Sequence, residues 1–249
     1  LFDESISSMN FYEYTPQTQA NNNTHGHPIV ITINNEDNYI LPSKSYISVK
    51  GQIRRANNNN VYTADTEITL INNAMMYLFT AIKYELGATV IESISHPGQV
   101  TSMIGYLRYP DDFSTRSGFK CCWSKDTSDN ADSHKYNQSP AQAAGVIAAG
   151  ALTPVENPNY NQGFAARKGY LFSSDPLGCF EFHIPLSHIF GFAEYKKLIY
   201  GLKHTLTLTR GSDNQALYRN AGAVDGKVDI TNISWHMLQI QMTPEYLAG

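Results

Sequence analysis

The feature that most constrains the fold is a strict alternation of apolar and polar residues in short segments. In residues 46–54, Ile47, Val49, Gly51 and Ile53 share one face, while Ser48, Lys50, Gln52 and Arg54 share the other. Residues 202–209 repeat the pattern with leucine and histidine alternating with lysine and threonine. Successive side chains of a strand point to opposite faces of its sheet, so this pattern predicts half-buried β-strands.

The same criterion predicts further strands. They lie at residues 29–33, 66–70, 82–86, 90–94, 178–184 and 228–242, and Tyr39–Pro42 is a short extended piece. The last of these segments changes phase: Val228 and Ile230 come first, then Ile233, Trp235 and Met237, then Leu238, Ile240 and Met242. A phase change inside one long strand predicts a β-bulge.

Two short helical segments interrupt the strands. The Asn72-Asn73 pair precedes residues 74–79 and predicts a helix whose first free amides bond to asparagine side chains. After Pro97, the residues Val100, Met103, Ile104 and Leu107 fall at i, i+3, i+4 and i+7. This spacing predicts an amphipathic helix with one apolar face.

These segments amount to seven to nine strands with two or three short helices, and strands do not alternate with helices. The chain is therefore expected to be all-β, an antiparallel β-sandwich of two packed sheets. Periodicity alone does not separate a jelly roll from an immunoglobulin-like sandwich.

A long irregular segment, residues 110–165, separates the two groups of strands. It is rich in Ser, Asp, Asn, Ala, Gly and Pro. A loop of this length inside a compact domain is functional or mobile. Its alanine-rich part, residues 141–151, is also compatible with a helix packed on the sandwich. At the other end, residues 5–19 are interpreted as an arm laid against a neighbour or as the first strand of the sheet.

The order of these segments resembles the first jelly roll of the double jelly-roll major capsid proteins of adenovirus-like DNA viruses, with the Polinton or Maverick branch as the nearest likeness. The likeness covers residues 28–109, including the strand followed by NNAMMYLF, the glycine hairpin and the helix that ends in Tyr-Leu. It returns at residues 169–245 with RKGYLFSSDPLG, LKHTLTLTRG and ITNISWHMLQIQMTPE.

The resemblance implies one jelly-roll domain over residues 1–249, with core strands in 28–109 and 169–245. Residues 110–165 are then a loop insertion that faces solvent or adjacent subunits, and residues 1–27 an N-terminal arm. In that family a second jelly roll follows the first, so we expect either that the gene product continues past Gly249 or that this is a single-domain relative or fragment. The first residue is Leu1 rather than Met, which also favours a piece of a longer product.

Composition narrows the classes of partner. Lys and Arg total 18 against 22 Asp and Glu, a net charge of -4 that gives no electrostatic reason for whole-surface binding to nucleic acid or acidic lipid. Charged residues make up only 16% of the chain, which suits surfaces that meet other proteins. A β protein rich in polar turns has the same composition. No apolar run approaches the ~20 residues of a membrane-spanning helix.

Metal and disulfide chemistry have weak support. Cys121 and Cys122 are adjacent, where a mutual disulfide is strained, and Cys179 is the third cysteine. His25-Gly26-His27 has the HxH spacing of a cupin metal motif, but it lies in an Asn-rich turn without a placed third histidine. We therefore expect no metal site, and loop histidines are the default interpretation.

No motif supports an enzyme. The chain lacks a G-x-S-x-G elbow and a G-x-x-x-x-G-K phosphate loop, and Asp111-Asp112 is interpreted as a solvated turn. We expect no catalytic residue, no cofactor-binding residue and no cofactor.

The sequence is best interpreted as a structural viral or virus-derived capsid protein that forms trimeric capsomers and an icosahedral shell. Its expected partners are copies of itself, with penton or minor capsid proteins as further candidates and no direct sequence-specific nucleic acid. The expected location is the virion, assembled inside the host cell. Residues 5–14 and 110–165 should lose exposure on assembly. The alternative is a β-sandwich recognition module for a glycan or protein, with Tyr106, Tyr109, Trp123 and Tyr136 as an exposed stacking platform.

Overall fold

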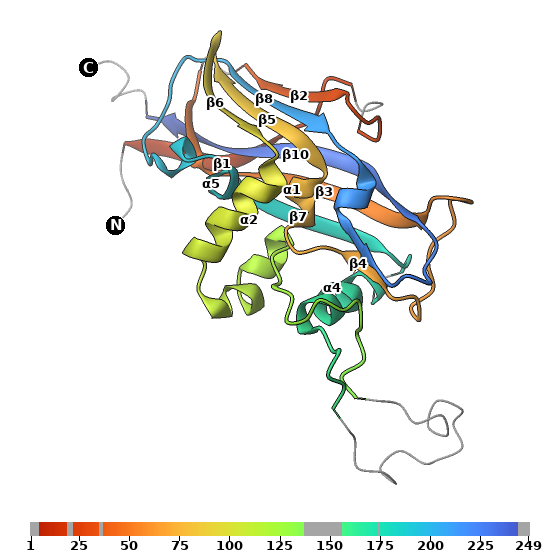
Figure 1. Ribbon diagram of the computed structural model, residues 1–249. Coiled ribbons are helices and arrows are strands. Elements are labelled where there is room, and N and C mark those ends of the chain that lie inside the picture. The colour runs from red at the N-terminus through yellow and green to blue at the C-terminus, as the bar shows by residue number, and fades with distance from the viewer. Residues whose placement is uncertain (1–4, 19–21, 35–36, 137–155, 174, 244–249) are drawn as a thin grey trace.

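Two four-stranded antiparallel sheets pack face to face in the computed structural model, which describes residues 5–18, 22–34, 37–136, 156–173 and 175–243 (Figure 1). The first sheet has the order β1-β10-β3-β7 and the second β2-β8-β5-β6. The strands of the first sheet are β1 (Ile6–Tyr14), β10 (Gly226–Met242), β3 (Tyr39–Arg55) and β7 (Cys179–Pro185). Those of the second are β2 (Pro28–Ile33), β8 (His204–Arg210), β5 (Phe79–Leu86) and β6 (Thr89–Ser95).

The strand order identifies the sandwich as a jelly roll. When the eight strands of the two large sheets are lettered B to I in chain order, the sheets become B-I-D-G and C-H-E-F. In this order, consecutive strands alternate between the two sheets except for the β5–β6 hairpin, which distinguishes a jelly roll from an immunoglobulin-like sandwich. The expected all-β, antiparallel jelly-roll fold is confirmed.

The predicted strands agree with those observed, with three differences. Residues 39–42 and 46–54 belong to one continuous strand, β3. Residues 6–14 form strand β1, which pairs with β10 at the edge of the sheet. Of the two interpretations of this segment, the first strand of the sheet is therefore the observed one. The segment 215–226, which lies outside the predicted strands, contains the short strand β9 (Leu217–Arg219), paired with β4 (Ile68–Leu70).

Strand β10 contains the predicted irregularities. Its pairing with β3 shifts register between Ile230 and Asn232 and again between His236 and Leu238. These are the two positions at which the apolar residues change phase. At the first shift β10 has one residue more than β3, and this returns Ile233, Trp235 and Met237 to the space between the sheets, because a one-residue slip moves every following side chain to the other face. At the second shift the additional residues lie in β3, and Leu238 and Ile240 are buried outside the core cluster. Trp235, between the two shifts, is fully buried in the core.

The helices are short and lie outside the sandwich. They are α1 (Ala74–Tyr77), α2 (Pro97–Arg108), α4 (Gln162–Phe172), α5 (Leu186–Ile189) and the 3₁₀ turns η2 (Asp111–Thr115), η3 (Gly118–Cys121), η4 (Phe192–Glu194) and η5 (Asp213–Gln215). No helix among the described residues is both long enough and apolar enough to span a bilayer.

Helix α2 packs inward through its smallest residues. Gly98, Thr101 and Gly105 are buried, and the ring of Tyr77 lies against Gly98 while that of Trp123 lies against Gly105. A Cβ atom at either glycine would overlap the ring that faces it. The helix therefore approaches the body of the protein closely on a strip that carries almost no side chain.

A buried polar network fixes α2 to the sandwich. The Asn73 amide donates to the hydroxyls of Thr101 and Ser102, at 2.7 and 3.0 Å. Its oxygen lies 3.0 Å from Nε2 of His188, whose Nδ1 is 2.6 Å from the Tyr109 hydroxyl. Because an amide oxygen only accepts, His188 carries its proton on Nε2 and accepts from Tyr109 through Nδ1. The predicted helix cap is therefore wrong: Asn73 adopts a positive φ and its side chain bonds across the structure instead of to the first amides of α1.

The network constrains the charge of His188. Burial lowers the pKa of its imidazole to about 4, and burial also lowers the pKa of His204, which bonds to the Tyr84 hydroxyl, to about 4. Both rings are thus neutral at pH 7. Between pH 4 and about 6.5, the two histidines of an unfolded chain, with an ordinary pKa of ~6.5, bind protons that they do not bind in the folded chain.

Stability is therefore expected to fall as pH decreases from about 6.5 toward 4, by about 3 kcal/mol for each of these two histidines. Replacing His188→Gln should reduce proton uptake on unfolding at pH 5.5 by about one, measured from the pH dependence of urea unfolding. Val90→Gln, a substitution at an exposed position that adds and removes no titrating group, serves as the control and should retain the wild-type slope. An unchanged slope in His188→Gln would contradict the buried neutral state.

Two of the helical glycines, Gly105 and Gly169, allow a matched test of the α2 contact. Gly105→Ala places a methyl group against Trp123 and should destabilise the protein by about 1–3 kcal/mol, the range for overpacked cores. Gly169→Ala in α4 meets open space and should be neutral or stabilising by up to about 1 kcal/mol. Thermal and urea unfolding measure both. Equal effects of the two substitutions would show that α2 does not pack closely on Trp123.

Candidate interaction surfaces

The apolar face of α2 points away from the protein. Met103 is 69% exposed and Leu107 is 90% exposed, and Ile104 and Tyr106 are also exposed. The sequence predicts that Met103, Ile104 and Leu107 share a helix face with Val100, but an amphipathic surface helix ordinarily turns that face to the core. Here the small residues occupy the inner side, so the apolar side chains remain in solvent. We call Met103, Ile104, Tyr106 and Leu107 the α2 face.

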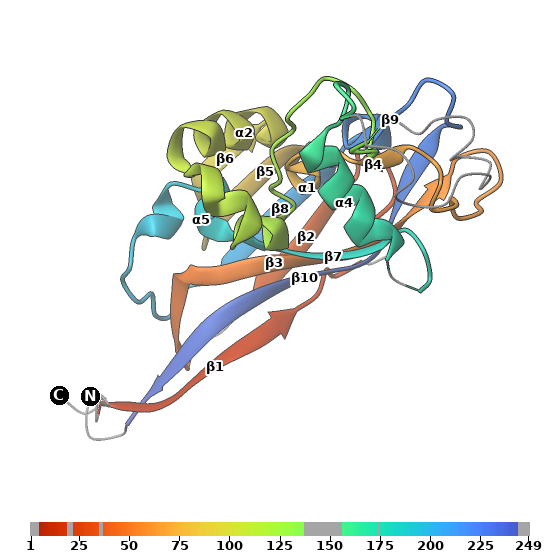
Figure 2. The same cartoon turned by 90° about the horizontal axis from the view of Figure 1, so that it is seen from below.

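A second exposed surface is the ribbon formed by β1 and the C-terminal half of β10. Figure 2 shows this pair of strands extending beyond the rest of the sandwich. β1 is an edge strand, and Met9, Phe11 and Tyr12 on it are exposed. An edge strand has one row of backbone donors and acceptors without a neighbouring strand, which makes it a template for further pairing.

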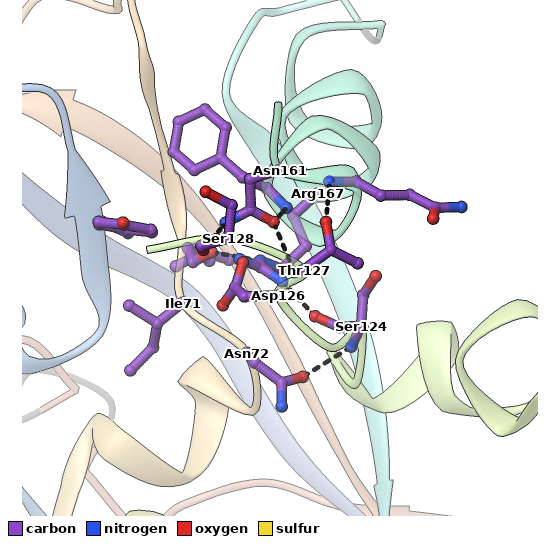
Figure 3. Close-up of polar contacts among 12 residues, drawn as sticks. Ile71, Asn72, Ser124, Asp126, Thr127, Ser128, Asn161 and Arg167 are labelled. Atoms are coloured by element: carbon purple, nitrogen blue, oxygen red, sulfur yellow. Dashed lines mark hydrogen bonds and ion pairs between the residues drawn. The ribbon is translucent and has the colours of Figure 1, made fainter. Parts of the chain in front are cut away.

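The long segment predicted as a loop insertion is fixed at its base by Arg167 of α4 (Figure 3). The Arg167 side chain is 2% exposed. Its Nε donates to the Leu70 carbonyl at 2.7 Å, and its terminal nitrogens donate to the Ser124 carbonyl and, at 2.6 Å, to the Asp126 carboxylate. One buried guanidinium thus joins strand β4, the outgoing arm of the segment and helix α4.

Asn161, on the returning arm of the long segment, also holds the base of that segment together, as Figure 3 shows. Its oxygen accepts from the backbone amides of Thr127 and Phe164, the second of which caps α4. Its amide donates to the carbonyls of Ser128 and Asn130, at 2.7 and 3.2 Å. All hydrogen-bonding positions of this fully buried side chain are used.

The base of the segment is part of the core, in contrast to the expectation that residues 110–165 face solvent or adjacent subunits. Cys121, Cys122 and Trp123 are all buried, and the predicted insertion ends inside α4, which begins at Gln162. The alanine-rich residues 141–151 lie outside the described residues.

The expected aromatic platform is not an exposed surface, although the rings of Tyr106 and Tyr109 do contact that of Trp123, with centroids 5.4 and 5.2 Å away. Trp123 is fully buried between α2 and His188, and Tyr109 is only partly exposed. Tyr106 and Tyr136 are exposed. The interpretation of these four residues as a stacking platform is therefore wrong, because the largest ring belongs to the core. An isolated tryptophan in a polar stretch carries no periodic signal that would have indicated its burial.

The sequence candidates for chemistry lie apart from one another. His25 and His27 are exposed in a turn around Gly26, and His25 Nε2 lies 3.6 Å from the Asp213 carboxylate. Asp111 and Asp112 are exposed in η2 and pair with Lys125 and Arg116. Neither pair converges on another set of ligands within the part of the chain that the structure describes.

One group that sequence reasoning did not identify combines Glu67, Asp132 and His134, with ligand atoms close enough to share a metal ion. The Glu67 carboxylate is already paired: the Lys168 ammonium lies 2.6 Å from it, and it also accepts from Ser133 at 2.8 Å. A cation would have to displace this lysine. The group is best interpreted as a second structural tie between α4 and the arms of the long segment.

Removing the Arg167 guanidinium should loosen this base. Arg167→Met leaves the buried Leu70 and Ser124 carbonyls without donors and is expected to destabilise the protein by about 3–5 kcal/mol. Arg116→Met, which removes an exposed arginine paired with Asp112, should cost less than about 1 kcal/mol. Chemical unfolding measures both variants, and a loss for Arg167→Met no larger than that for Arg116→Met would contradict the role given to Arg167.

Comparisons with known proteins agree with this architecture. Residues 152–245 match the family model of the double jelly roll-like domain. The Faustovirus major capsid protein superposes with a TM-score of 0.53 at 12% identity, over 99% of this chain and 56% of that chain. A chain from the cryo-EM structure of the Sputnik virophage gives a TM-score of 0.56 at 8% identity, over 98% of this chain and 50% of that one. The comparison with curated protein sequences gives no match.

The present chain thus spans about half the length of the structures it matches. At these identities the similarity establishes the fold, and it confirms the resemblance drawn from the order of the strands. The chain has the jelly-roll fold of the double jelly-roll major capsid proteins.

Proposed function

We propose that the chain is a structural viral or virus-derived capsid protein that self-associates into trimeric capsomers of an icosahedral shell. The observation that carries this proposal is the α2 face, an apolar surface held outward on a jelly roll whose fold is that of capsid proteins. Clusters of exposed apolar side chains on a folded protein mark interaction sites. The role is structural and requires no catalytic residue.

Charge supports association between protein surfaces rather than binding of nucleic acid. The formal net charge of -4 gives no long-range attraction to phosphate. The exposed residues of the α2 face and of β1 include tyrosine, phenylalanine, methionine and leucine. Aromatic residues and methionine are enriched at protein interfaces, where they exclude water over a large area.

The proposed partners are further copies of the chain, with penton or minor capsid proteins as additional components of the shell. The proposed location is the virion, after assembly inside the host cell. Because the matched structures are about twice as long, a second jelly roll, in the same gene product or in another copy, is the proposed occupant of part of the exposed surface.

Sedimentation velocity and negative-stain imaging of the full-length gene product test this function. The wild type should form trimers or larger shells. The double substitution Met103→Glu/Leu107→Glu introduces two charges into the α2 face and should weaken association at least about tenfold, because buried unpaired charges are costly.

Val224→Glu provides the control, since Val224 is an exposed apolar residue outside the α2 face. It should assemble as the wild type does. A monomeric wild type at all concentrations would contradict the proposed function, and unimpaired assembly of Met103→Glu/Leu107→Glu would exclude the α2 face as the surface used.

A further inference from the structure

A cleft of about 450 Å³ lies beside the first sheet, where β3, η2, η3 and α5 meet. Its volume falls within the range of roughly 300–1,000 Å³ that is usual for small-molecule sites. The residues that line it have no part in the surfaces proposed for assembly.

One wall of the cleft is a row of parallel rings. Tyr109 stacks on Phe113 with ring centroids 3.9 Å apart and planes at 11°, and its ring is parallel to that of His188, to which its hydroxyl is hydrogen-bonded, with centroids 5.7 Å apart. Tyr46 of β3 and His183 of β7, with centroids 5.1 Å apart, add a second pair of rings to the lining. Such surfaces bury an apolar ligand without requiring a specific hydrogen bond.

The buried part of the lining is uncharged at neutral pH. Burial lowers the pKa of His188 to about 4, and burial raises the pKa of the Cys121 thiol and of the Tyr109 hydroxyl to about 12 each. His188 and Cys121 are therefore a neutral imidazole and a neutral thiol. This part of the cleft favours hydrocarbon and disfavours a charged group.

The lysine side chains of the lining lie at the exposed part of the cleft. Lys44 and Lys120 both line it, both are exposed, and neither has an ion pair among the described residues. None of the lining residues is acidic. Glu181, the acidic residue bonded to His183, also pairs with Lys50 and does not line the cleft.

We propose that this cleft binds a small anionic amphiphile of the fatty-acid type, with its hydrocarbon chain along the Tyr109 and Phe113 rings and its carboxylate between Lys44 and Lys120. The cleft complements such a molecule, because its neutral apolar walls lie apart from its two unpaired ammonium groups. A nucleotide also combines rings with negative charge, but the lining lacks the Asn, Gln and Asp side chains that bond to the edges of bases.

Isothermal titration with decanoate, kept below the concentration at which it forms micelles, tests the proposal. Decanoate should bind saturably with one site per chain. Decanol, which has the same chain without the charge, should bind more weakly, and adenosine monophosphate should not bind. Absence of saturable decanoate binding, or tighter binding of adenosine monophosphate, would overturn the assignment.

Two variants locate the site. Lys44→Gln/Lys120→Gln should weaken decanoate about tenfold and bring its affinity near that of decanol. Ser117→Trp, which fills the cleft from an exposed position, should abolish binding of both compounds. The control Lys196→Gln/Lys203→Gln removes the same charge at two exposed lysines outside the cleft and should bind as the wild type does.

Thermal unfolding verifies that each variant is folded, and the affinity of any folded variant then decides the question. Equal loss of decanoate affinity in the two double-lysine variants would show that only overall charge matters and would overturn the site. Retained binding in folded Ser117→Trp would place the ligand elsewhere and would overturn it as well.

Discussion

The close contact between α2 and Trp123 determines which surface this jelly roll presents. A tryptophan ring can lie against a helix backbone only where the helix carries no side chain, and Gly105 supplies that position. Gly98 and Thr101 extend the strip along the same side, where the Asn73 amide bonds to Thr101. With its inner side used by small residues, the helix has to direct Met103 and Leu107 outward. The exposed apolar surface is therefore a consequence of core packing and not an incidental feature of the helix.

The same contact joins otherwise separate parts of the protein. His188, which bonds to Asn73, also bonds to Tyr109 at the end of α2, and Tyr109 forms part of the cleft wall. Ser124 follows Trp123 in the chain, and its carbonyl accepts a hydrogen bond from Arg167, which fixes α4 and the base of the long segment. Packing, the buried polar network and the proposed ligand site thus share residues, so a change that moves α2 is expected to affect all three.

Much of the fold follows from local sequence. Strands with one buried face show their period directly, and β10 shows even its bulge at residues 230–232, because that shift appears as a change of phase among apolar residues. The orientation of α2 could not be obtained in this way. Periodicity shows that Met103 and Leu107 share a face but not which side meets the core. The i, i+3, i+7 spacing of Gly98, Thr101 and Gly105 is the signal that indicates it. The roles of Asn73, Trp123 and Arg167 depend on partners distant in sequence, which no local pattern specifies.

The outward face of α2 is proposed as the surface through which jelly rolls associate. Cryo-EM of the assembled particle tests it most directly, by the exposed fraction of Leu107 in the assembly compared with 90% in the isolated chain. The account predicts that Leu107 and Met103 become buried against another jelly roll. Particles in which both side chains remain in solvent would contradict it.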